Sequence, residues 1–173
     1  MNETIKNLKE RRSCRNYKKE QIKDEELNEI LLAGEYAPTG MGLQSPKMIV
    51  LQNKETIERL SKLNAKIMGR DIDPFYGAPT VIVVLADKTK MTYIEDGSLV
   101  LGNLMNAAHS LKIGSCWINR AREEFETEEG KKLLKEWNIP DNYVGIGHCI
   151  LGYRDGELPQ AKPRKKNYVT IIK

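Results

Sequence analysis

The chain has 173 residues, of which 40% are hydrophobic and 30% are charged, and its formal net charge is +4. This length fits a single domain, residues 1–173, with a core of its own. No apolar run approaches the roughly 20 residues of a membrane helix, and the first residues lack the apolar stretch of a signal peptide. Three widely spaced cysteines argue against a disulfide framework. We therefore expect a globular, cytoplasmic protein.

Apolar spacing and capping residues predict two helices, a loop, a strand and a third helix in the first half. Asn2 is expected to cap a helix that ends near Glu10, and Asp24 to cap a second that stops before Pro38. The loop that follows contains two glycines and two prolines, and such an irregular segment suits ligand binding. The expected bounds are 38–46 for this loop, 48–51 for the strand and 54–67 for the third helix.

The second half is expected to mix strands and helices without strict alternation. The run 80–85 is almost continuously β-branched, which indicates a strand buried on both faces. Apolar residues at helical spacing follow over 96–111 and predict a long helix. The other expected elements are strands over 114–118, 145–153 and 168–172 and one helix over 123–137. This pattern is typical of the α+β class.

A compact basic segment near the start is the most informative feature of the sequence. It brings Arg11, Arg12 and Arg15 within five residues and adds the hydroxyl of Ser13. The planar fork of arginine matches a phosphate bidentately, so an organic phosphate fits this segment. The alternative is a solvated basic turn. A second basic segment, 162–166, either converges with the first on one anion or forms a separate solvated surface.

The sequence contains no obvious side-chain catalyst. His109 and His148 lie within predicted apolar elements, where we expect structural roles, and Cys14 and Cys149 are expected in the core. The alternative for Cys14 is a reactive thiol, activated by the neighbouring guanidinium groups. Nucleophile-elbow, phosphate-loop and metal-ligand patterns do not occur, and the acidic run 123–129 is expected to be a solvated helix face. An anion-binding segment without a protein acid, base or nucleophile indicates that a bound cofactor carries the chemistry.

Five segments match one family pattern in the same order. Residues 11–17 are Arg-Arg-Ser-Cys-Arg-Asn-Tyr, and residues 37–44 are Ala-Pro-Thr-Gly-Met-Gly-Leu-Gln. The others are 77–79 before a strand, 107–111 leading to 114–118, and 151–153 followed by 162–164. Together they resemble the nitroreductase-like family of FMN-dependent NAD(P)H oxidoreductases, with its Arg-Arg-Ser-x-Arg-x-Phe motif and Ala-Pro-Ser-x-x-Asn-x-Gln loop. The chain departs from that pattern at Gly42, often Asn in the family, and at Ser45-Pro46, commonly Pro-Trp.

The resemblance implies which side chains hold the FMN phosphate. The implied ligands are Arg11, Ser13, Lys162 and Arg164, with Arg12 beside them. Arg15 would lie near the ribityl chain and the N1/C2 carbonyl edge of the flavin, where its positive charge favours acceptance of a hydride.

The resemblance also implies how the flavin ring is held. Backbone N–H groups near Ile118 and Asn119, which follow Trp117, would face flavin N5 and O4. Asn64 is expected to bind the pyrimidine edge, and the alternative is an ordinary exposed helix asparagine. The opposite subunit would contribute a loop that contains Pro38, Thr39, Gly40, Gly42 and Gln44.

The fold and activity follow from the same resemblance. It implies a nitroreductase-like α+β fold, with a central mixed β-sheet flanked by helices, in a homodimer that holds FMN at its interface. Hydride would pass from NADH or NADPH through flavin N5 to a nitroaromatic, quinone or similar acceptor by a ping-pong mechanism, without a metal. The alternatives are a flavin storage or sensor module with little turnover, and a nucleic-acid binder with strongly salt-dependent affinity.

Overall fold

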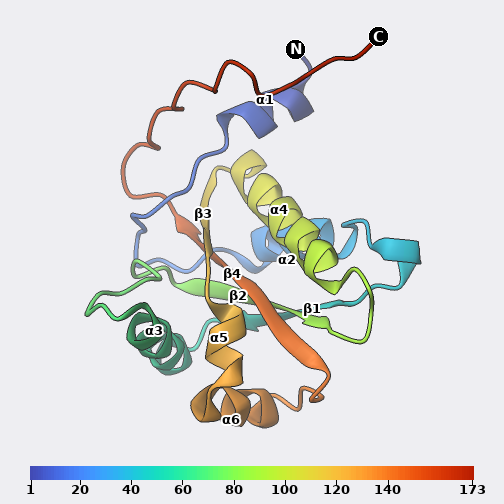
Figure 1. Ribbon diagram of the computed structural model, residues 1–173. Helices are drawn as coiled ribbons and strands as arrows, with labels where there is room; N and C mark the ends of the chain where they lie inside the picture. Colours follow the sequence, from blue (N-terminus) through green and yellow to red (C-terminus); the bar gives the residue numbers. More distant parts are fainter.

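The computed structural model describes residues 1–173 as a four-stranded β-sheet with six α-helices around it. Figure 1 shows the sheet in the middle of the molecule with helices on both sides. The helices are α1 (Glu3–Glu10), α2 (Asp24–Glu35), α3 (Lys54–Met68), α4 (Tyr93–Ser110), α5 (Ala121–Glu126) and α6 (Glu128–Glu136). The strands are β1 (Pro46–Leu51), β2 (Thr80–Asp87), β3 (Ile113–Ile118) and β4 (Tyr143–Tyr153), and a 3₁₀ turn, η1, spans Gly40–Gly42. The predicted α+β class is confirmed.

The strand order is β1-β2-β4-β3, and every neighbouring pair is antiparallel. The parallel pairing that a mixed sheet requires is limited to one isolated bridge, between Ser13 and Ser115. Residues 81–86 of β2 have no exposed surface, which confirms the strand predicted to be buried on both faces. β3 is an edge strand, and the basic segment lies beside it.

Two apolar layers hold the helices on the sheet. Ile30 of α2 and Leu104 of α4 belong to the cluster on one face, and Leu60 of α3, Phe125 of α5 and Leu133 of α6 belong to the cluster on the other. Figure 1 shows α2 and α4 on one side of the sheet and α3, α5 and α6 on the opposite side. The outer edge of β3 is bordered by the basic segment, which forms a bridge between Ser13 and Ser115 there.

Capping residues were predicted for the first two helices, and one of these two predictions is confirmed. The side chain of Asn2 accepts a hydrogen bond from the Ile5 N–H at 2.9 Å, as expected. The prediction that Asp24 caps α2 is wrong, because Lys23 is the N-cap residue and Asp24 is the first residue of the helix. The Lys23 N–H donates to the carboxylate of Glu26 at 3.1 Å, so a glutamate inside the first turn satisfies the helix start.

The single helix predicted over 123–137 is two helices in the structure. The chain is extended at Thr127, and its Oγ1 accepts the N–H of Gly130 at 2.9 Å, which makes Thr127 the N-cap of α6. A Cβ on Gly130 would lie 2.0 Å from the carbonyl oxygen of Glu124, so α6 turns directly against α5. A threonine side chain that hydrogen-bonds to the nearby backbone is favoured at a helix cap rather than in a helix interior. This preference explains why α5 ends before Thr127.

The predicted strand over 168–172 is wrong. The segment has no strand partner, and every residue beyond Leu158 is exposed. Tyr168, Val169, Ile171 and Ile172 are 70–93% exposed, although their β-branched pattern favours a strand. Figure 1 shows this tail as an extended arm that leaves the body after β4. None of the helices has the length and apolar character needed to cross a membrane.

Candidate functional site

The basic segment is attached to the edge of the sheet by its backbone. The N–H of Cys14 donates to the carbonyl of Ser115 in β3 at 2.8 Å, next to the Ser13–Ser115 bridge. The N–H of Lys18 donates to the carbonyl of Tyr153 at the end of β4 at 2.9 Å. Cys14 is 5% exposed, which confirms its predicted place in the core. The segment is therefore held at both ends by the sheet.

A pair of glycines allows this close approach. Gly114 of β3 and Gly152 of β4 are directly opposite each other in the sheet. A Cβ on Gly114 would lie 2.7 Å from Cys14 Sγ, and a Cβ on Gly152 would lie 2.9 Å from the ring of Tyr17. Both distances are shorter than a van der Waals contact, so any larger residue would push the basic segment away from the sheet.

Arg11 and Arg12 each have a buried guanidinium nitrogen without a hydrogen-bond partner. These atoms are Nη1 of Arg11 and Nε of Arg12. Arg12 is fixed at its other end, because its Nη1 donates to the carbonyl of Lys9 at 2.7 Å at the end of α1. Buried donors without partners are unfavourable, and an anion beside them would satisfy both. The residues present therefore fit a phosphate group better than the alternative of a solvated turn.

Arg154 extends this cationic cluster with His109 beside it, and the sequence reasoning missed both residues. Nη2 of Arg154 is 3.0 Å from Nδ1 of His109, and its Nε is buried without a partner. Burial lowers the pKa of Arg154. Burial, followed by the positive charges of Arg154 and Arg11, lowers the pKa of His109, so the imidazole is neutral near pH 7 and accepts the hydrogen bond. The available signal was the arginine directly after Gly152-Tyr153.

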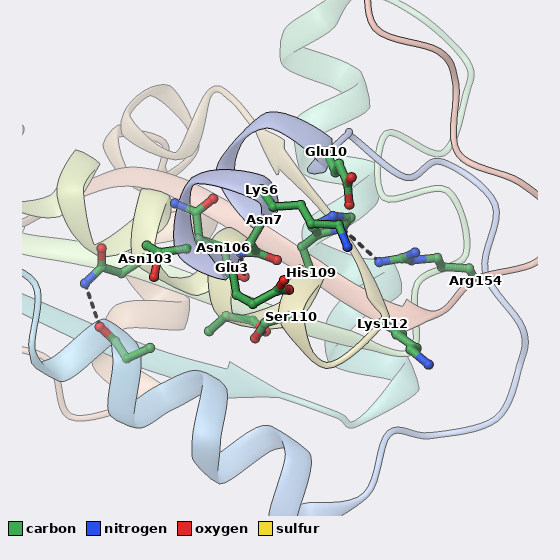
Figure 2. A pocket seen from close by; sticks show the side chains of 13 residues that line it. Glu3, Lys6, Asn7, Glu10, Asn103, Asn106, His109, Ser110, Lys112 and Arg154 are labelled. Atoms are coloured by element: carbon green, nitrogen blue, oxygen red, sulfur yellow. Dashed lines mark hydrogen bonds between the residues drawn. The ribbon is translucent and has the colours of Figure 1, made fainter. Parts of the chain in front are cut away.

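A polar groove with a volume of about 700 Å³ runs between α1 and α4 beside the cluster. Figure 2 shows Asn7 of α1 against Asn106 of α4, with Arg154 near one end of the groove. The Asn7 amide donates to the Asn106 carbonyl at 2.9 Å and fixes α1 on the C-terminal half of α4. Glu3 and Glu10 also line the groove, so its charges are of both signs.

The predicted ligand loop over 38–46 is anchored on Asp96 of α4. Its Oδ2 accepts from Ser45 Oγ at 2.6 Å, and its Oδ1 accepts from the Gly40 N–H at 2.9 Å. Burial alone would raise the pKa of Asp96, but the hydrogen bonds from Ser45 and Gly40 outweigh it and lower that pKa. Gly42 has a φ of +66°, in the left-handed region that favours glycine. Asp96 is a structural residue of the loop that the sequence did not single out.

The loop and the basic segment lie toward opposite ends of α4 within one chain. The loop contacts Asp96 near the N-terminus of the helix, whereas α1 contacts Asn106 near its C-terminus. Ten residues of α-helix span about 15 Å. Pro38 and Gln44 are exposed at a distance from Arg11, and a single chain does not bring the two predicted parts of the site together.

The turn after β3 presents two free backbone donors. The N–H groups of Asn119 and Arg120 donate no hydrogen bond within the chain. Asn119 is exposed, Ile118 is buried, and Trp117 packs against the core between the sheet and α4. Trp117, Asn119 and Arg120 line a cavity of about 280 Å³ beside the N-terminal part of α4. The predicted backbone donors are thus available at this turn, one residue further along than expected.

Asn64 is fully buried, so the alternative of an exposed helix asparagine is wrong. Its Nδ2 donates to the carbonyl of Asn119 at 2.9 Å and also to the carboxyl group of Glu124. Its Oδ1 accepts from Nε of Arg120 at 2.9 Å. The amide is thus occupied by protein partners next to the turn, and direct contact with a flavin stays a prediction.

Glu124 and His148 form a buried pair behind Asn64. Both have no exposed surface, and Oε2 of Glu124 is 2.5 Å from Nε2 of His148. The prediction that the whole run 123–129 is a solvated face is therefore wrong at Glu124, because α5 turns this residue toward the sheet. His148 also contacts the rings of Phe75 and Phe125 edge-on, which agrees with a structural role.

The remaining predicted ligands are exposed. The guanidinium carbon of Arg15 lies 5.9 Å from the centre of the Tyr76 ring, a distance typical of a cation–π contact. Lys162 and Arg164 lie in the exposed tail, where their side chains form no hydrogen bond or salt bridge. Their role as phosphate ligands stays a prediction.

Comparison with known proteins identifies the family. The family model described as the nitroreductase family matches residues 8–153. A relative from Archaeoglobus fulgidus, provisionally named NADH dehydrogenase/NAD(P)H nitroreductase, is 33% identical over 163 residues, which cover 91% of this chain and 88% of the relative. A Bacillus subtilis protein named FMN reductase (NAD(P)H) is 27% identical over 185 residues, covering 95% of this chain and 70% of the relative. The crystal structure of a Bacteroides fragilis nitroreductase with bound FMN matches with a TM-score of 0.93 and 30% identity over 100% of both chains. This chain belongs to the nitroreductase family.

Proposed function

We propose that this protein is an FMN-dependent oxidoreductase that takes reducing equivalents from NAD(P)H and transfers them to a nitroaromatic, quinone or similar acceptor. The observation that carries the proposal is the presence of free hydrogen-bond donors at two places along β3. Unpartnered guanidinium nitrogens of Arg11 and Arg12 lie at the Ser115 end, and free N–H groups lie at Asn119 and Arg120. Four strand residues span about 13 Å, which is within the length of an FMN molecule.

In this proposal the protein binds and orients, and the cofactor carries the chemistry. FMN supplies hydride acceptance from a nicotinamide and electron donation to an acceptor. Arg11 and Ser13 bind the phosphate, with Arg12 held beside them by the end of α1. Arg15 lies at the ribityl side, and its fixed positive charge stabilises negative charge on the reduced ring. Asn119 and Arg120 offer backbone donors to the ring edge.

The two reactants are proposed to use one binding position in turn. Because the cofactor carries the chemistry, neither reactant needs a separate site with a protein acid, base or nucleophile. A single position that first accepts the nicotinamide and then the electron acceptor gives ping-pong kinetics. We propose that a second subunit supplies the loop over 38–46 to this site, because within one chain the loop lies toward the far end of α4 from Arg11.

A homodimer is therefore part of the proposal. Three features support it: the separation of the loop from the basic segment, the exposed apolar residues Ile5 and Leu8 on α1, and the exposed apolar tail that contains Ile171 and Ile172. A second subunit would cover these exposed apolar side chains. FMN would then lie between the subunits.

Steady-state kinetics with FMN-loaded protein tests the proposal. Under anaerobic conditions, oxidation of more than one equivalent of NADH or NADPH per bound flavin is expected only when a nitroaromatic, a quinone or free flavin is added, with parallel lines in double-reciprocal plots. Slow reduction without repeated turnover would favour the storage or sensor alternative instead. No oxidation with any of these acceptors, by protein that contains bound FMN, contradicts the proposal.

A further inference from the structure

A fully buried hydrogen-bond network lies directly behind the turn that follows β3. It joins Asn64 of α3, Glu124 of α5 and His148 of β4, and none of the three has exposed surface. Glu124 contacts His148 through one carboxyl oxygen and accepts from the Asn64 amide through the other. Burying three polar side chains is unfavourable unless each is hydrogen-bonded, and here they bond to one another and to the turn, with Nδ1 of His148 the one atom of the network left without a partner.

The network fixes Asn64 in one orientation. Two acceptors face its Nδ2, the Asn119 carbonyl at 2.9 Å and the carboxyl group of Glu124, and one donor, Nε of Arg120, faces its Oδ1 at 2.9 Å. A reversed amide would place its oxygen against two acceptors and its NH₂ against a donor. Asn64 therefore holds both the carbonyl of Asn119 and the side chain of the next residue.

This double contact determines the direction of the peptide between Asn119 and Arg120. The C=O and N–H of a planar trans peptide point in opposite directions. Because Asn64 draws the Asn119 carbonyl toward α3, the Arg120 N–H is directed away from α3. That N–H donates no hydrogen bond within the chain, and Arg120 lines the cavity of about 280 Å³ beside α4.

The backbone at Arg120 has an uncommon conformation. Its φ is +78°, in the left-handed region that residues other than glycine seldom adopt. Such a conformation persists only where surrounding contacts maintain it. Here the Asn64 amide holds Arg120 through its side chain and through the carbonyl that precedes it.

We infer that Asn64, supported by Glu124 and His148, is a positioning residue that aims the Arg120 backbone N–H at the flavin ring. This inference rests on the proposed function, since it requires FMN at the β3 edge. Asn64 acts in it through the peptide, in place of the direct contact with the flavin that the resemblance implies. The arrangement assigns a role to three buried residues that bind neither the phosphate nor the acceptor.

Arg120→Gly separates this role from a purely structural one. Glycine adopts a φ of +78° without strain, and this gain offsets the loss of the donor to Asn64 Oδ1, so apo-protein stability is expected to change little. The variant loses the contact with Asn64 and leaves the peptide free to rotate, so the Kd for FMN is expected to rise about three- to tenfold. The midpoint potential of the bound flavin is expected to shift as well. A residue that served only the fold would change affinity in step with stability.

Asn64→Ala provides a second test that keeps Arg120 in place. It is expected to weaken FMN binding and shift the potential in the same direction as Arg120→Gly, although it lowers stability by leaving Glu124 with an unpaired oxygen. Asn138→Gly is the matched control, because Asn138 also has a positive φ, of 54°, in the turn before β4. The control is expected to leave both the Kd and the potential unchanged.

The outcomes distinguish this inference from the proposed function. Wild-type affinity and potential in Arg120→Gly would overturn the positioning role and leave the proposed function intact. Failure of the wild-type apo-protein to bind FMN would overturn both. Weaker binding with an unchanged apo-protein melting temperature supports the inference.

Discussion

Arg11 and Arg15 are four residues apart and are predicted to act on different parts of the same cofactor. Arg11 has a buried, unpartnered Nη1, whereas Arg15 is exposed over the ring of Tyr76. Arg11→Ala is expected to weaken FMN binding about tenfold or more, because a charge-assisted hydrogen bond is lost. Arg15→Ala is expected to change mainly the potential of the flavin that remains bound. Titration of apo-protein with FMN and spectroelectrochemistry measure the two effects.

Arg70→Ala is the matched control for these two substitutions. Arg70 is exposed, and its side chain makes no hydrogen bond or salt bridge. The control removes the same charge, so any general electrostatic effect on FMN binding would affect it equally. Equal changes in Kd and potential for Arg11→Ala and Arg15→Ala would refute the division of roles.

The carboxylate of Asp96 is expected to stabilise the loop over 38–46. Its pKa is lowered in the folded protein, so its stabilising effect is present above the unfolded pKa and is lost as the pH falls through the folded pKa. Asp96→Asn leaves a donor from Ser45 or Gly40 unpaired and is expected to cost about 1–3 kcal/mol near neutral pH.

Urea denaturation of both proteins from about pH 7 down to about pH 2 measures this effect across the usual aspartate pKa. The difference in free energy of unfolding between wild type and Asp96→Asn is expected to shrink below about pH 4. A difference that stays constant over the whole range would show that the Asp96 carboxylate does not stabilise the loop through its charge.

The contact between the basic segment and the sheet depends on glycine in β3. A Cβ at position 114 would lie 2.7 Å from Cys14 Sγ, so Gly114→Ala is expected to cost about 1–3 kcal/mol and to displace Arg11 and Arg12. FMN affinity is expected to fall with it. Cys14→Gly in the same chain removes the clash and is expected to restore part of the loss, which a double-mutant cycle quantifies.

Gly102→Ala is the control for Gly114→Ala, because it also replaces a glycine within a regular element. Gly102 lies in α4, and a Cβ there would meet no atom within 4 Å. Alanine is the better helix former, so this variant is expected to be more stable by about 0.5–1 kcal/mol and to bind FMN normally. Normal FMN binding by Gly114→Ala would contradict the explanation of the glycine pair.

Helices and strands that their own sequence determines were predictable, whereas those that depend on contacts with other segments were not. The β-branched run of β2 and the apolar spacing of α3 determine these elements locally, so their positions were predicted closely. The break at Thr127 required knowing that its hydroxyl caps a second helix. Residues 168–172 have strand-forming side chains, but a strand needs a partner, and the single chain provides none.

The candidate site shows the same division. The segment 11–15 has a distinctive composition, so an anion site there could be proposed from the sequence. Asp96 and the Asn64–Glu124–His148 network could not, because each is defined by contacts between residues far apart in the chain, and the only signal for Arg154 was its position after Gly152-Tyr153. Glu124 in particular looked like part of an acidic surface until the turn of α5 placed it in the core.

The whole molecule is expected to be a dimer in solution. The subunit mass is 19.7 kDa, so light scattering coupled to size exclusion should give about twice this value. Removal of residues 159–173 is expected to weaken the dimer and to release FMN, because the exposed apolar tail and Lys162 and Arg164 are lost together. A stable monomer that retains FMN at full affinity contradicts the proposed interface.

The central claim is that this protein transfers reducing equivalents from a nicotinamide to bound FMN. The most direct test is to mix FMN-loaded protein with NADH or NADPH under anaerobic conditions and to follow the visible absorption of the flavin. We predict rapid loss of the oxidised flavin band with one of the two nucleotides, and its return when a nitroaromatic or quinone is added. An absorption spectrum that neither nucleotide changes would contradict the account.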